Sequence, residues 1–146
     1  MKSGLLRVLR VRQLLEELAG ATLRTRTAEL RRIEEGAEQH ERQALRTRTE
    51  ALDQMQRGES ADAWLGMADA EILAWTSQRL RAAARHAKPA VEAAHEQMLA
   101  RRVEKRQAEA LLTDAEQAEQ QEALRREQHR LDDWFQTASG NVRRAE

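Results

Sequence analysis

The sequence of 146 residues contains no cysteine and no tyrosine, one proline, one phenylalanine and three tryptophans. The lack of cysteine excludes a disulfide framework, thiolate metal sites and a cysteine nucleophile. Two isoleucines, five valines and four aromatic residues are too few to cover the faces of a β-sheet. Arginines interrupt the leucine cluster near the start, and no window approaches 18 apolar residues. We therefore expect neither a membrane span nor a cleavable signal, and a cytoplasmic protein is the default.

The chain also has no excess of positive or negative charge, because 25 basic residues balance 25 acidic ones. Zero net charge disfavours non-specific binding to nucleic acid or to a membrane surface, since both require a basic excess. Ala, Glu, Lys, Leu and Arg make up 88 of the 146 residues. That bias is typical of long helices and coiled coils, and the shortage of large aliphatic residues suits a thin seam between two helices.

Helix-breaking residues divide the chain into few segments. Gly58-Glu59-Ser60 predicts a turn, and Pro89 predicts the end or a kink of a helix. The expected elements are a helix over about 5–57, an insert helix over about 60–87, a helix over about 90–137 and a frayed tail over 138–146. The fold class is then all-α: a single elongated domain, 1–146, in which two long helices form an antiparallel coiled-coil hairpin with a short helical insert near the tip.

Apolar periodicity predicts which faces form the seam. In the first helix the stripe begins at Leu5 and Val8 and ends at Leu52 and Met55. In the last helix a second stripe runs along one heptad position, from Val103 to Leu131. The members of these two stripes are Leu5, Val8, Val11, Leu15, Leu18, Leu30, Ile33, Ala37, Ala44, Leu52 and Met55, and then Val103, Ala110, Leu124 and Leu131.

Residue patterns that carry chemistry are incomplete. Glu92 and His95 have the spacing of a di-iron ligand pair, but such a site needs a second Glu-x-x-His pair and two further glutamates from facing helices. The glycines form no phosphate-binding loop, and no serine has a nucleophile-elbow context. We predict no enzyme, and no catalytic, metal-binding or cofactor-binding residues.

Two surface features point to partners. The first 32 residues are rich in arginine, so a hairpin that binds structured RNA is one interpretation, but acidic residues intervene and stacking aromatics are absent. Trp64 and Trp75 are eleven residues apart, hence on one helical face. They either pack the hairpin tip or form an exposed patch for a partner. Trp134 and Phe135 are expected beside the N-terminal leucines, where they would lock the open end of the coil.

The segment from Arg125 to Phe135, Arg-Arg-Glu-Gln-His-Arg-Leu-Asp-Asp-Trp-Phe, resembles the C-terminal signature of the type III secretion central-stalk family. That family comprises the YscO-like injectisome proteins, with flagellar FliJ as a more distant relative. The Leu/Arg-rich opening from Leu5 to Arg12 is also similar to theirs. The resemblance covers about 20 residues in motif and the whole chain in layout.

This resemblance implies a non-enzymatic cytoplasmic stalk, peripheral to the secretion apparatus at the bacterial inner membrane. Its paired termini would enter a hexameric secretion ATPase, and its tip would face an export-gate protein, with secretion chaperones as further partners. A generic coiled-coil adaptor without an ATPase partner is the alternative. Mapped onto this sequence, the ATPase end would comprise Leu5, Leu6, Leu9, Arg10, Arg12, Arg126, Gln128, Leu131 and Asp133, and the tip Trp64, Leu65, Ile72 and Trp75.

Overall fold

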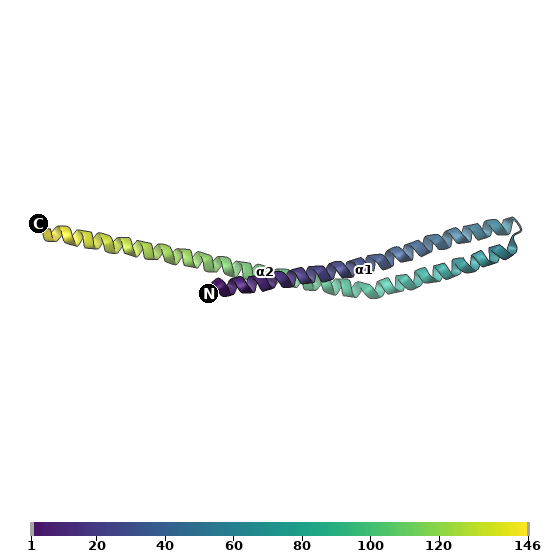
Figure 1. Cartoon of the computed structure of the whole chain (residues 1–146), viewed down its shortest axis with the longest axis horizontal. Helices are drawn as coiled ribbons and strands as arrows, with labels where there is room; N and C mark the ends of the chain where they lie inside the picture. The colour runs from purple at the N-terminus through teal and green to yellow at the C-terminus, as the bar shows by residue number, and fades with distance from the viewer. Residues whose placement is uncertain (1, 146) are drawn as a thin grey trace. The chain divides into compact units, whose positions relative to one another are not determined.

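A computed structural model describes the backbone of residues 2–145 and the side chains of residues 2–140. It contains two α-helices, α1 over Lys2–Gln56 and α2 over Ser60–Ala145, and no strand within the described residues (Figure 1). The two helices pack antiparallel. The predicted all-α fold with two long antiparallel helices is therefore confirmed.

The turn between the helices is built around Gly58. Its φ of 83° lies in the left-handed region, which glycine enters without a steric cost. The amide of Gly58 donates to the carbonyl of Met55 at 3.2 Å, and that of Glu59 donates to Gln54 at 3.0 Å. These two bonds satisfy the last carbonyls of α1 in the Schellman pattern. The turn predicted at Gly58 is confirmed.

Of the end or kink predicted at Pro89, the end is wrong, because α2 runs through it as one helix. Proline removes one helical hydrogen bond and costs about 3 kcal/mol in a helix interior. Pro89 lies on the exposed side of α2, whereas Ala84 and Ala94 on either side are buried against α1. Packing on both sides of the proline holds the helix together, so no separate insert helix exists.

The expected stop at residue 138 is also wrong, because α2 continues to Ala145. The hydroxyl of Thr137 donates to the carbonyl of Asp133 at 2.8 Å, and that of Ser139 donates to Phe135 at 2.7 Å. These polar side chains therefore bond back within the helix and do not cap its end. Residue 146, the last of the expected tail, lies outside the described residues.

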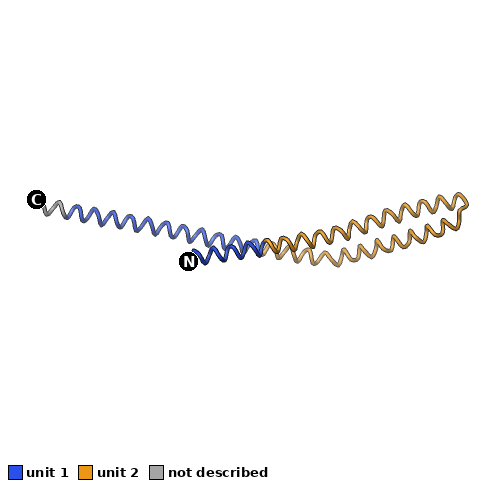
Figure 2. Tube along the Cα trace, in the orientation of Figure 1, with its two compact units in different colours: residues 1–16, 101–146 blue, residues 17–100 orange. Residues whose placement is uncertain are grey.

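The chain divides into two compact units, Met1–Glu16 with Arg101–Glu146 (unit 1) and Glu17–Ala100 (unit 2) (Figure 2). Each unit contains parts of both helices. The single domain expected from the sequence stays a prediction.

In unit 2 the helices meet along a seam of small residues, which recur every seven positions over 37–51 on α1 and over 63–84 on α2. No large side chain within the described residues is fully buried. A Cβ added at Gly66 would lie 3.0 Å from the Cβ of Ala51, which shows how closely the helices approach. The hydroxyl of Ser77 donates across the seam to the carbonyl of Ala37 at 2.8 Å. The buried members of this seam are Ala19, Ala37, Ala44 and Ala51 on α1 and Ala63, Ala70, Ser77, Ala84 and Ala94 on α2.

The stripe of large residues predicted for the seam is therefore partly wrong. Ala37 and Ala44 are buried as expected, but Leu18, Leu52 and Met55 are exposed. Each of these three lies one residue away from a buried or half-buried position. Close helix approach requires small side chains, so large ones next to the seam point outward.

Candidate partner-binding surfaces

Ion pairs link the start of α1 to the middle of α2 in the paired part of unit 1. Lys2 lies 3.5 Å from Glu116 and 3.6 Å from Glu119, and Arg12 lies 2.6 Å from Glu104. These pairs fix the register of the two segments. Lys2 is the first described residue of α1, so the register leaves the part of α2 beyond Glu119 without a described partner on α1.

The Glu16 carboxylate closes the same network. It lies 2.7 Å from Lys105 and 3.2 Å from Arg102. Hydrogen bonds from Lys105 and Arg102 lower the pKa of Glu16, and the bond to Glu16 raises the pKa of Lys105. A hydrogen bond from Arg101 and the charge of Arg12 lower the pKa of Glu104. These contacts favour the charged forms of Glu16, Glu104 and Lys105, and they favour one alignment of the helices.

Beyond this network, α2 continues as a single helix. Every side chain from Gln117 to Thr137 is exposed. Figure 2 shows this part of unit 1 running past the start of α1. We call residues Gln117–Gly140 the C-terminal extension.

The extension carries four large apolar side chains in open solvent. Leu124 is 65% exposed, Leu131 58%, Trp134 64% and Phe135 60%. The Trp134 and Phe135 rings meet edge to face, with centroids 5.1 Å apart and an interplanar angle of 76°. Exposed apolar residues gathered on one short helix segment are typical of a protein-binding surface.

The ATPase-end residues do not come together as the sequence predicted. Leu5 and Leu9 are half-buried, and the ion pairs of Lys2 and Arg12 place them opposite the part of α2 between Glu104 and Glu116. Leu131 belongs to the extension and lies 15 residues beyond Glu116 along α2. The expected contact of Trp134 and Phe135 with the N-terminal leucines is therefore wrong.

The individual members of the set have these positions. Leu6 and Arg10 are exposed, and Arg12 is occupied by its pair with Glu104. Within the extension, Arg126 pairs with Glu122 one turn earlier. Gln128, Leu131 and Asp133 are exposed. The set therefore divides into residues on the segment of α1 that packs against α2 and residues on the extension, which has no described partner on α1.

The predicted tip residues all lie on α2 in unit 2 and all face solvent. Trp64 is 71% exposed, Leu65 67%, Ile72 62% and Trp75 58%. The Arg79 guanidinium lies 4.8 Å from the centre of the Trp75 ring, a cation–π contact. The interpretation that the tryptophans pack the hairpin tip is wrong, and an exposed apolar face remains.

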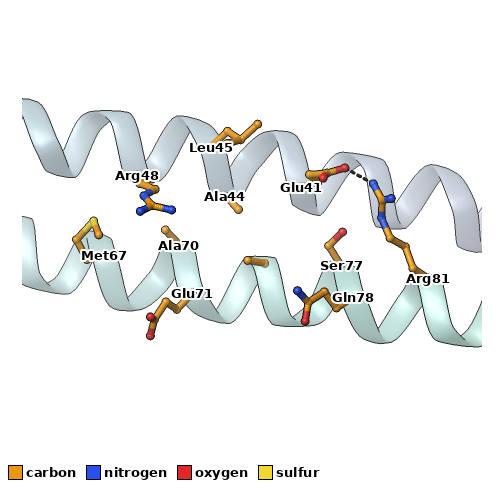
Figure 3. A pocket seen from close by; sticks show the side chains of 11 residues that line it. Glu41, Ala44, Leu45, Arg48, Met67, Ala70, Glu71, Ser77, Gln78 and Arg81 are labelled. Atoms are coloured by element: carbon orange, nitrogen blue, oxygen red, sulfur yellow. Dashed lines mark hydrogen bonds and ion pairs between the residues drawn. The ribbon is translucent and has the colours of Figure 1, made fainter.

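A shallow groove of about 460 Å³ lies between the helices of unit 2. Ala44 and Ala70 form its floor, and Leu45 and Met67 flank it (Figure 3). An ion pair between Glu41 and Arg81 crosses from one helix to the other at one end. The groove results from small residues in the seam, which leave space between the larger flanking side chains.

Other kinds of site find no support in the residues described. Residues 2–140 contain no group of His, Asp and Glu side chains arranged to hold a metal ion. Neither helix, over its described length, has an apolar stretch long enough to cross a bilayer. Comparison with protein-family models, with curated proteins and with solved structures finds no significant match to this chain.

From the sequence we expected the C-terminal part of α2 to pair with α1, although the sequence contains a signal that this pairing ends. In unit 1 the half-buried and buried positions of α2 include Lys105, Ala108, Leu112 and Ala115. The same heptad positions continue as Glu119, Glu122, Arg126 and His129. An apolar seam that turns polar marks the end of helix pairing.

Proposed function

We propose that this chain is a non-enzymatic stalk of a type III secretion export apparatus, and that its extension is the part that enters the hexameric secretion ATPase. One observation carries the proposal. The segment that resembles the stalk family, Arg125–Phe135, lies wholly within the extension, where its side chains are exposed. A signature that supported only the intramolecular coil would be buried against α1.

The physical character of the extension suits a ring pore. A single helix is about 10–12 Å wide with its side chains, narrower than a two-helix coil. Leu131 and Phe135 supply apolar contacts, while Arg126 and Asp133 supply charges of both signs. Exposed ion pairs are worth less than about 1 kcal/mol each, so such contacts form and break easily as the shaft meets successive subunits.

The N-terminal group has a different role in this proposal from the one the sequence suggested. Leu5, Leu9 and Arg12 hold α1 against α2 and thereby brace the base of the extension. Leu6 and Arg10 remain exposed beside that base and are available to the rim of the ring.

The apolar face of unit 2 is the proposed site for the export gate. Trp64, Leu65, Ile72 and Trp75 are exposed on one helix, and tryptophans are enriched at binding hot spots. Secretion chaperones are further candidate partners.

The proposal is tested with the full-length chain and its cognate secretion ATPase. The chain should bind the ATPase and alter its hydrolysis or its assembly into hexamers. Leu131→Glu should weaken binding by about tenfold or more, because it places a charge in the apolar stripe of the extension. The matched control, Gln43→Glu on α1 of unit 2, should leave binding unchanged. A wild-type chain without any effect on binding, hydrolysis or assembly would refute the proposal.

A generic coiled-coil adaptor is the second candidate. It is favoured by the exposed Trp64–Trp75 face of unit 2, which a stalk does not need in order to enter a ring. In that case Trp64→Ala and Trp75→Ala should abolish partner binding, while Leu131→Glu should have no effect. The two candidates are therefore separated by which substitution matters.

A further inference from the structure

The extension has its own heptad pattern, separate from the seam of the hairpin. Leu124, Leu131 and Ala138 recur every seven residues, and Phe135 follows Leu131 by four. In heptad terms the first three occupy d positions, and Gln121, Gln128 and Phe135 occupy a positions. The outward positions carry mostly polar residues, namely Glu122, Arg126, His129, Arg130, Asp133, Gln136 and Thr137.

This stripe faces away from the line on which α1 packs. That line continues into the extension at Glu122 and Arg126. Leu124 is two residues from each, which is about 200° around the helix. The Leu124 stripe is therefore not an extension of the hairpin seam, and lengthening α1 would not cover it. Covering it requires a helix other than α1.

We propose that two copies of the chain pair through this stripe, with their extensions antiparallel. The occupant is a second copy because the stripe matches itself in charge as well as in apolar pattern. In antiparallel coiled coils a positions pack against d positions, and each e position lies beside an e position of the other helix.

One register satisfies the apolar and the charged positions together. It places Phe135 against Leu124 of the second copy, and Gln128 against Leu131 of the second copy. By symmetry each contact occurs twice. In the same register Arg125 at e lies beside Asp132 of the second copy, again twice. Opposite charges at these flanking positions favour the pairing.

The competing arrangements bring like charges together. Moving the antiparallel register by one heptad in one direction places Arg125 beside Arg125 of the second copy, and moving it in the other direction pairs Asp132 with Asp132. A parallel pair would instead place Glu127 at g beside Asp132 at e of the second copy. Only the first antiparallel register avoids repulsion and also covers Phe135.

The dimer is expected to be weak and reversible. Four large side chains per copy, each about 60% exposed, bury on the order of 1,000 Å² in total when paired, which is near the lower limit for specific interfaces. A dissociation constant in the micromolar range follows, about 1–100 µM. Pairing buries the side chains with which the proposed stalk binds the hexameric ATPase. The binding surface of the extension would therefore be covered in the dimer and exposed in the monomer. The inference itself does not depend on the ATPase.

Sedimentation velocity of the full chain over about 1–300 µM tests the proposal. The wild type should pass from monomer to dimer with rising concentration. Arg125→Asp and Asp132→Arg should each raise the dissociation constant by about tenfold, because both attractive contacts become repulsive. The double variant Arg125→Asp with Asp132→Arg should restore it to within about threefold of the wild type. Arg130→Asp, on the outward side, is the matched control and should change it by less than about threefold.

Each contrary result is distinct. A monomer over the whole concentration range would overturn the proposal. Dimerisation that Asp132→Arg strengthens would show a parallel pair, because an arginine at position 132 would then face Glu127 of the second copy. Dimerisation that is indifferent to both single substitutions would place the contact on another surface. Far-UV circular dichroism of each variant checks that the helices remain intact, and none of these readouts involves the secretion ATPase.

Discussion

Replacing Ala51 by leucine should destabilise the hairpin, although it adds apolar surface to the seam. Ala51 is 1% exposed, and its Cβ lies 3.0 Å from where a Cβ would stand at Gly66 on the facing helix. Leucine adds three carbon atoms at a point where the helices already touch. Accommodation requires the helices to separate or the side chain to leave its rotamer, which costs about 1–3 kcal/mol.

The sign of this effect distinguishes two kinds of seam. In an ordinary leucine-based coil with space at this position, burying the new side chain would stabilise by about 1.5–3 kcal/mol. In a seam of small residues the same change should lower the melting temperature by about 2–12 °C.

Thermal unfolding of the full chain followed by far-UV circular dichroism measures the difference. Protein concentration is kept the same for all variants, since self-association shifts the midpoint. Gln43→Leu, at an exposed position of α1, is the control and should change stability by no more than about 0.5 kcal/mol. An Ala51→Leu chain that melts at a higher temperature than the wild type would refute the small-residue seam.

Two further predictions concern α2 and the ion-pair network. Pro89→Ala should raise the free energy of unfolding in urea by up to about 3 kcal/mol, because it restores a hydrogen bond at an exposed position of a continuous helix. Glu16 has a pKa lowered from 4.5, so its pairs with Lys105 and Arg102 stabilise the fold above that pH and lose this effect as the pH falls through the lowered value. Glu16→Gln should therefore flatten the acid side of the curve of stability against pH. Glu17→Gln, a neighbouring exposed substitution, serves as the control. A lower urea midpoint in Pro89→Ala, or an unchanged acid side in Glu16→Gln, would contradict these accounts.

The sequence predicted the two long helices more accurately than it predicted which face of each helix is buried. Composition and the turn at Gly58 were sufficient for two long antiparallel helices. The face assignments followed large apolar residues, such as Leu52 and Met55, and these are exposed. The buried line runs through alanines such as Ala51 and Ala63. Alanine is abundant everywhere in this chain, so its seven-residue spacing is hard to separate from background composition.

The breaks predicted in α2 failed for a related reason. The local signals at Pro89 and in the expected tail over 138–146 favour helix ends, but they act over one or two turns. Around Pro89 the packing of Ala84 and Ala94 acts over a longer range and outweighs the local cost. Propensity alone does not contain that tertiary contribution.

The sequence proposed candidate residues for the site, but it did not give their arrangement. Leu131 and Asp133 were selected through a resemblance, and they lie on an exposed surface. Their pairing with Leu5 and Leu9 assumed that the two helices end together. The register set by Lys2 with Glu116 shows that they do not. Long-range register depends on cross-helix ion pairs, which a single sequence does not identify.

The central claim is that α2 continues beyond the part that pairs with α1, so that the extension has no partner among the described residues of α1. Spin labels on cysteines at Arg7→Cys and Arg130→Cys test it directly, because both positions are exposed in unit 1 and the chain has no other cysteine. Double electron–electron resonance should be recorded on labelled chains diluted with unlabelled ones, so that only distances within one molecule contribute. The register predicts that the labels are separated by about 20 residues of helix, or roughly 30 Å. A distance of about 10–15 Å, the separation of residues paired across a two-helix coil, would contradict it.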